Sequence, residues 1–175
     1  MSFSKVQLIS NALILLGDEP INSLTDSGAG AKAGSNLYES SYFSILSSHR
    51  WKFATKKVKL ARLTASPLNE YKYQFQLPTD YINIITTYPR SDYRLLEDKL
   101  YSDSKEIEID YIYKVNEANF PAYFIKAFEY YLAMQLAIPV TEDYNKMDIM
   151  NKMYGIESRK ARYSDSQSSP SVPIL

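Results

Sequence analysis

The chain has 175 residues, of which 45% are hydrophobic and 23% are charged, as is typical of one soluble globular domain with room for a core. Lysine plus arginine and aspartate plus glutamate both number 20, so the formal net charge is zero. This balance excludes a protein that coats nucleic acid or membrane through bulk electrostatics. The absence of cysteine excludes disulfide frameworks, thiolate nucleophiles and cysteine metal sites.

The first part of the chain predicts two helices, over residues 4–16 and 29–48. Ser4 and Gln7 have the spacing of a capping box, and Gly17 is the kind of residue that ends a helix in the left-handed conformation. The second helix follows a stretch of small residues, and its apolar positions recur at helical spacing. We interpret Gly17 as a helix C-cap and the glycines at 28, 30 and 34 as loop residues, because they do not match a phosphate-binding loop.

The middle of the chain predicts an antiparallel β insertion over residues 56–113. Apolar and polar residues alternate over 71–77. This pattern places Tyr71, Tyr73, Phe75 and Leu77 on the buried face of a strand and Gln74 on its solvent-exposed face. Residues 81–88 predict a further strand, and residues 93–101 a hairpin. A third alternation sets Ile107, Ile109 and the two tyrosines that follow against acidic residues.

The last part predicts two more helices, over residues 121–138 and 141–163. The first is apolar nearly all round, so it must be covered on most sides, and Pro139 is expected to stop it. Residues 164–175 are rich in serine and proline and are expected to form a flexible extension. The fold class is therefore α+β and mainly helical: a single domain over residues 1–163, built as a helical bundle with an antiparallel β insertion, followed by a flexible C-terminal tail.

Nothing in the sequence predicts catalysis. His49 is the only histidine, which excludes metal sites built on histidine pairs, and we interpret it as a residue that packs beside Trp51. Acidic residues occur in adjacent pairs, which do not face each other across a cleft as a glycosidase requires. We therefore expect no enzymatic activity, no cofactor and no metal. No stretch approaches the roughly 20 apolar residues that span a bilayer, so we expect no membrane partner.

The segment of residues 49–62 has the sharpest charge pattern in the chain. It contains basic and aromatic residues and no acid. Such a segment suits a small nucleic-acid-binding module, in which cations contact phosphates and aromatic rings stack on bases. The same segment also suits an edge strand whose solvent-exposed face is protected by lysines. The neutral net charge of the chain favours this second interpretation. The possible DNA contacts are Arg50, Lys52, Lys56, Lys57 and Lys59.

Three features favour assembly with other chains. Tyrosine is in excess, with 16 copies, and its large ring with a polar tip suits protein interfaces. The apolar helix and the C-terminal residues also call for partners, since the tail ends in apolar residues that could order in a groove. The candidate subunit-interface residues are Tyr73, Phe75, Tyr111, Tyr113, Tyr123, Tyr130 and Tyr131.

Several motifs, taken in order, resemble the tail tubular protein A, or head-to-tail adaptor, family of short-tailed bacteriophages. The match spans nearly the whole chain. The residues in the first helix and after it are Asn11, Ala12, Leu13, Leu16, Gly17, Pro20, Ile21, Ser23 and Leu24. Those in the middle are His49 to Ala54, Leu77 to Tyr81 and Leu100-Tyr101. The last are Phe120-Pro121, Ala127, Tyr130, Ala133 and Ala137 to Thr141.

This resemblance implies a structural protein of the virion, made in the host cytoplasm and located at the junction of head and tail. Family members form a ring, typically of twelve copies, which joins the portal to the tail nozzle or tube and lines the channel for the genomic DNA. By the same resemblance, the C-terminal extension would bind the portal protein, and the strands would face neighbouring copies or the nozzle. The implied portal-binding residues are Ser169, Pro170, Val172, Pro173, Ile174 and Leu175.

Overall fold

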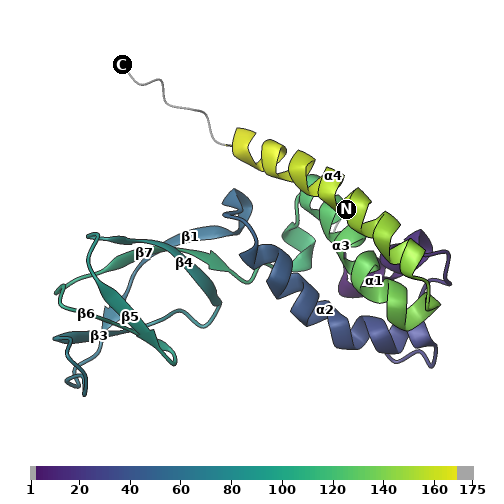
Figure 1. The fold of residues 1–175 in the computed structure, drawn as a ribbon. Coiled ribbons are helices and arrows are strands. Elements are labelled where there is room, and N and C mark those ends of the chain that lie inside the picture. Colours follow the sequence, from purple (N-terminus) through teal and green to yellow (C-terminus); the bar gives the residue numbers. More distant parts are fainter. Residues whose placement is uncertain (1–2, 169–175) are drawn as a thin grey trace. The chain divides into compact units, whose positions relative to one another are not determined.

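The computed structural model describes residues 3–168, and the implied portal-binding residues lie outside this range. The chain divides into two compact units (Figure 1). Within the described residues, the helical unit comprises residues 3–53 and 115–168, and the β unit comprises residues 54–114. The predicted fold class, α+β and mainly helical with an antiparallel β insertion, is confirmed. The insertion was expected over residues 56–113, close to these bounds.

The helical unit contains four α-helices and two short 3-10 helices in the described residues. The bounds are α1 Lys5–Leu15, α2 Ala29–Ser47, η1 Lys52–Ala54, η2 Glu117–Asn119, α3 Ala122–Thr141 and α4 Tyr144–Gln167. The predicted capping box is present: the Gln7 N–H donates to Ser4 Oγ, and the Ser4 N–H donates to Gln7 Oε1. Gly17 has a φ of +74°, which confirms its role beyond the end of α1.

Two predicted helix ends were wrong. Pro139 does not stop α3, which continues to Thr141, where the hydroxyl donates to the Ala137 carbonyl and Glu142 takes the left-handed conformation. A proline in the last turn removes one hydrogen bond but does not prevent the final two residues from following the helix. The α4 helix extends to Gln167, so residues 164–167 are helical and were wrongly assigned to the extension.

The core of the helical unit is built around α3, which packs against α1, α2 and α4. The apolar side chains Phe124, Phe128, Leu132 and Leu136 of α3 are fully buried. Aromatic rings from other segments meet them, with the Tyr38 ring 5.4 Å from Phe128. The other helices of the same chain therefore provide the cover that the apolar helix requires.

The β unit contains two antiparallel sheets. The first has the strand order β1-β7-β4, and the second has the order β2-β3-β6-β5. The bounds are β1 Thr55–Lys59, β2 Ala61–Arg62, β3 Tyr73–Gln76, β4 Tyr81–Tyr88, β5 Tyr93–Leu96, β6 Lys99–Ser102 and β7 Glu108–Tyr113. Strands β5 and β6 form the predicted hairpin.

One shared core stabilises the β unit. Its buried members are Leu60, Phe75, Leu77, Leu100, Ile107, Ile109 and Tyr111. The predicted alternation along β7 is confirmed, since Ile109 and Tyr111 face this core while Asp110 between them does not. Gln74 was expected on the wet face of β3 but is buried, because its Nε2 donates to the Ala65 carbonyl of the preceding loop at 2.9 Å.

Two glycines allow α1 and α2 to approach closely, so their assignment to a loop was wrong. Gly30 and Gly34 lie one turn apart inside α2. A Cβ atom at residue 34 would lie 2.5 Å from Cγ2 of Ile9, and one at residue 30 would lie 2.8 Å from Cδ1 of Leu13. Because both contacts are with buried side chains of α1, a larger residue at either position would force the helices apart.

We expect the Gly34→Ala substitution to destabilise the helical unit by about 1–2 kcal/mol, because overpacking outweighs the gain in helix propensity. Gly155→Ala in α4 is the matched control: no atom lies within 4 Å of its Cβ position. There the propensity gain should stabilise the unit by about 0.5–1 kcal/mol. Urea unfolding followed by the fluorescence of Trp51 measures both changes. Shifts of the same sign would contradict the close approach of α1 and α2.

Candidate interaction surfaces

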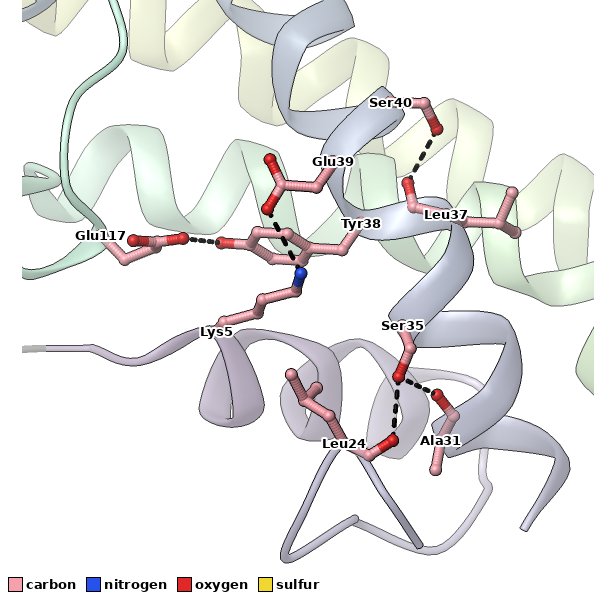
Figure 2. A network of polar contacts seen from close by, with 9 residues as sticks. All are labelled: Lys5, Leu24, Ala31, Ser35, Leu37, Tyr38, Glu39, Ser40 and Glu117. Carbon is pink, nitrogen blue, oxygen red and sulfur yellow. Dashed lines mark hydrogen bonds and ion pairs between the residues drawn. The ribbon is translucent and has the colours of Figure 1, made fainter. Parts of the chain in front are cut away.

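A polar network ties α2 to α1 and to η2 (Figure 2). The buried Tyr38 hydroxyl donates to Glu117 Oε1 at 3.1 Å, and Lys5 Nζ donates to Glu39 Oε1 at 3.3 Å while lying 4.7 Å from the centre of the Tyr38 ring. Burial and the Glu117 carboxylate raise the pKa of Tyr38, so it remains a neutral hydrogen-bond donor. These contacts join three segments of one chain.

Asp165 fastens the end of α4 to the rest of the helical unit. Its carboxylate is 1% exposed. The Lys52 N–H donates to Oδ2 at 2.8 Å, and the Tyr123 hydroxyl donates to Oδ1 at 2.9 Å. Lys52 Nζ also donates to the Ser166 carbonyl at 2.6 Å. The structure therefore uses Lys52, a candidate DNA contact, and Tyr123, a candidate interface residue, to hold its own helix in place.

The lysines of β1 are paired with acids of the same unit. Lys56 lies 2.7 Å from Asp80, Lys57 lies 3.5 Å from Glu108, and Lys59 lies 2.8 Å from Glu106. Strand β1 is an outer strand of its sheet and pairs with β7 alone, which confirms the interpretation of an edge strand protected by lysines. These charges are therefore largely matched within the chain, and among residues 3–168 Arg50 is the one candidate DNA contact of the five for which no such role is found.

Asp80 joins β1 and β7 to the turn before β4. It accepts hydrogen bonds from Lys56 and from the Tyr111 hydroxyl, the latter at 3.0 Å. Burial by itself would raise the pKa of Asp80, but these two hydrogen bonds outweigh it and lower the pKa. Burial, followed by the bond to Asp80, raises the pKa of Tyr111 to about 12. This arrangement stabilises the β unit and gives Tyr111 an internal partner.

Two of the predicted interface residues are unable to contact a neighbouring copy. Phe75 is 0% exposed and Tyr111 is 4% exposed, because both belong to the core of the β unit. The remaining candidates are partly exposed, yet each already has a partner in the chain. Tyr73 lies under Arg62, Tyr113 under Lys56, Tyr130 near Lys126, and Tyr131 beside Tyr154. Much of the tyrosine excess therefore serves internal packing.

The structure reveals an exposed apolar stripe that the sequence analysis missed. Ile149, Ile156 and Tyr163 of α4 are 52%, 40% and 70% exposed. They recur every seven residues, which places them on one side of the helix, away from the buried Met150 and Ala161. We name these three residues the α4 outer face. Its seven-residue spacing is already present in the sequence of the helix predicted over residues 141–163.

A second exposed apolar region lies on the β unit. Strand β5 is an outer strand, so one of its edges has no neighbouring strand within the described chain. Its residues Tyr93, Leu95 and Leu96 are each more than a third exposed. We name these three residues the β5 edge. An exposed strand edge with apolar side chains is suited to contact with another protein.

Among residues 3–168, no three His, Asp or Glu side chains come together in a way that could hold a metal ion. His49 packs edge-on against Trp51 at 4.9 Å, as predicted, and burial followed by the charge of Arg162 lowers its pKa. No α-helix within these residues combines the length and hydropathy needed to cross a membrane.

No protein-family model matches the chain, and no curated protein matches it.

We expect the Asp165→Ala substitution to destabilise the helical unit by about 2–4 kcal/mol, because the Lys52 N–H and the Tyr123 hydroxyl lose a buried acceptor. Urea unfolding followed by Trp51 fluorescence measures the change. Asp148→Ala is the control, since Asp148 is exposed on the same helix and its loss should change stability by less than about 0.5 kcal/mol. Equal stabilities of the two variants would show that Asp165 does not fasten α4.

Proposed function

We propose that the chain is a structural head-to-tail adaptor of a bacteriophage virion. In this role it forms a ring, of twelve copies by the family resemblance, between the portal protein and the tail nozzle or tube. The ring surrounds the genomic DNA, and the protein acts by binding rather than by catalysis. The ordered series of motifs from Asn11 to Thr141 supports this proposal.

The observation that carries the proposal is the α4 outer face. The apolar surface of α3 is covered inside the chain, so self-association requires apolar surface elsewhere, and the α4 outer face supplies it. Full burial of an isoleucine side chain contributes about 1.5–3 kcal/mol. Two isoleucines and a tyrosine on one helix face therefore form a plausible centre for a contact between copies.

A ring also needs two unlike surfaces on each copy, because its contacts are heterologous. The α4 outer face and the β5 edge are unlike in structure, since one is a helix face and the other is a strand edge. In a ring, one of these two surfaces would contact the copy on one side. The other surface would contact the copy on the opposite side or the tail protein. This division supports a connector more than a monomeric nucleic-acid-binding module built on residues 49–62, whose β1 lysines are paired with acids and whose Lys52 binds a backbone carbonyl.

We expect the Ile156→Glu substitution to prevent ring formation. A carboxylate in the α4 outer face would weaken each contact by at least about 2 kcal/mol, which is about 30-fold in Kd. The mass of each complex, measured by light scattering with and without the portal protein of the same genome, reports assembly. Wild type should reach a multimer at least in the presence of the portal protein, and the variant should not.

The matched control is Asn151→Glu, which adds the same charge to the same helix. At about 100° per residue, residue 151 points about 120–160° away from the three residues of the α4 outer face. This variant should assemble like wild type. If wild type stays monomeric in both conditions, or if Ile156→Glu assembles normally, the proposed ring through the α4 outer face is wrong.

The portal contact is tested by deleting residues 169–175. A longer deletion, from residue 164, would also remove the buried Asp165 and so confuse binding with folding. The short deletion retains α4 to its end at Gln167, so we expect unchanged thermal unfolding and a loss of binding to the portal protein. Co-purification with the portal protein measures the binding. Portal binding as strong as that of the full chain would remove these residues from the mechanism.

A further inference from the structure

Two adjoining hollows on the β unit form a groove with basic walls. Their volumes are about 530 and 640 Å³, and both are lined by Arg62 and Lys105. Lys72 lines the larger hollow, and the pair Lys59 and Glu106 lines the smaller one. We name Arg62, Lys72 and Lys105 the basic groove. Two of these residues come from segments far from the basic stretch of residues 49–62, so the fold and not the local sequence brings them together.

The positions of the three cations are held by the strands beneath them. Arg62 lies on β2, opposite Phe75 of β3, and its guanidinium lies 5.2 Å from the centre of the Tyr73 ring. The Lys72 N–H donates to Asp103 Oδ1 at 3.0 Å, which holds the segment before Lys105 beside β3. The Leu60 N–H donates to the Ile107 carbonyl at 2.9 Å, which holds the segment after Lys105 beside β2.

The basic groove carries an excess of positive charge that the chain does not neutralise. Within residues 3–168, none of its three side chains forms an ion pair with a carboxylate. Glu106 also lines the groove, but Lys59 holds its carboxylate at 2.8 Å, and this hydrogen bond lowers the pKa of Glu106. Lys59 and Glu106 therefore cancel, and three positive charges remain. The lysines of β1 lack this excess because each faces its own acid.

The groove walls favour a polyanion over a protein partner. The hydroxyls of Thr64 and Ser66 lie in the same lining, and the large apolar residues Leu60 and Phe75 are 6% and 0% exposed. The partly exposed Leu63 and Tyr73 also line the larger hollow, but the Arg62 guanidinium lies over the Tyr73 ring. Protein interfaces are centred on exposed apolar or aromatic side chains, whereas nucleic-acid interfaces are polar and strongly positive, as most of this lining is. Lysine, arginine and hydroxyl side chains are the groups that contact phosphates without reading base sequence.

We propose that the basic groove binds the phosphate backbone of double-stranded DNA, independently of base sequence. The choice of DNA rests on the proposed function, in which the genome passes each copy of the ring. Three cations per copy give contact that salt weakens readily, since each phosphate neutralised contributes about −0.9 to the slope of log K against log salt concentration. Three contacts predict a loss of affinity of about 40-fold between 50 and 200 mM salt.

The test compares the full-length wild-type chain with the triple variant Arg62→Gln, Lys72→Gln, Lys105→Gln. Fluorescence anisotropy with two short DNA duplexes of unrelated sequence measures binding across the same salt range. We expect equal affinity for both duplexes in wild type. The triple variant should reduce the salt slope by about 3 and lower the affinity at low salt at least about 10-fold.

The matched control is Arg90→Gln, Lys32→Gln, Lys152→Gln, which removes the same charge from exposed positions outside the groove. It should bind DNA like wild type. Equal losses in both triple variants, or no measurable binding by wild type at low salt, would overturn the proposal. Stronger competition by polyglutamate than by DNA at equal charge would also overturn it, because it would identify the ligand as an acidic protein segment.

Light scattering on the same samples separates this proposal from the ring. If the chain binds DNA through the basic groove but never forms a multimer, the proposal of a DNA-binding groove stands and the proposal of a ring is wrong. If the chain assembles with the portal protein but both triple variants bind DNA equally, the proposal of a ring stands and the proposal of a DNA-binding groove is wrong.

Discussion

The rest of the structure depends on covering α3, a helix that is apolar on nearly every side. Three other helices of the chain meet it. The close approach of α2 to α1 requires glycine at residues 30 and 34, and Asp165 fastens the end of α4 by binding the Lys52 N–H and the Tyr123 hydroxyl. With α3 covered internally, the α4 outer face and the β5 edge provide apolar surface for contact with other proteins.

Local patterns in the sequence predicted most of the elements but not the contacts between them. The capping box at Ser4, the left-handed Gly17 and the alternation along β7 depend on a few neighbouring residues, and all three are confirmed. The position of Gly34 against Ile9 depends on residues 25 positions apart, and no local pattern reports such an approach. Gln74 is buried for the same reason, since its partner Ala65 belongs to a preceding loop whose path the alternation does not predict.

Local sequence patterns predicted the candidate interaction surfaces less well than the helices and strands. A tyrosine on a strand has the same sequence pattern whether its face meets the core or a partner, so Phe75 and Tyr111 were placed on the wrong surface. The basic stretch of residues 49–62 was visible because its charges are adjacent, but the acids that match them come from β7, the segment before it and the turn before β4. The sequence did not predict the basic groove. Its residues Arg62, Lys72 and Lys105 are far apart in the sequence, and the pairing of β2 with β3 and the bond from Lys72 to Asp103 bring them close together.

The whole chain has a net charge of zero, but its charges are not evenly matched. The β unit has one surface on which lysines are paired with acids and another that keeps an excess of positive charge. On the edge strand β1, each lysine faces a carboxylate, so that surface protects an open strand without attracting a polyanion. Beside β2, three cations form no ion pair with a carboxylate within residues 3–168, so that surface attracts a polyanion. The apolar surfaces are separate from both, on the α4 outer face and the β5 edge. Because contact with protein and contact with DNA are assigned to different side chains, substitutions can remove either one while leaving the other in place.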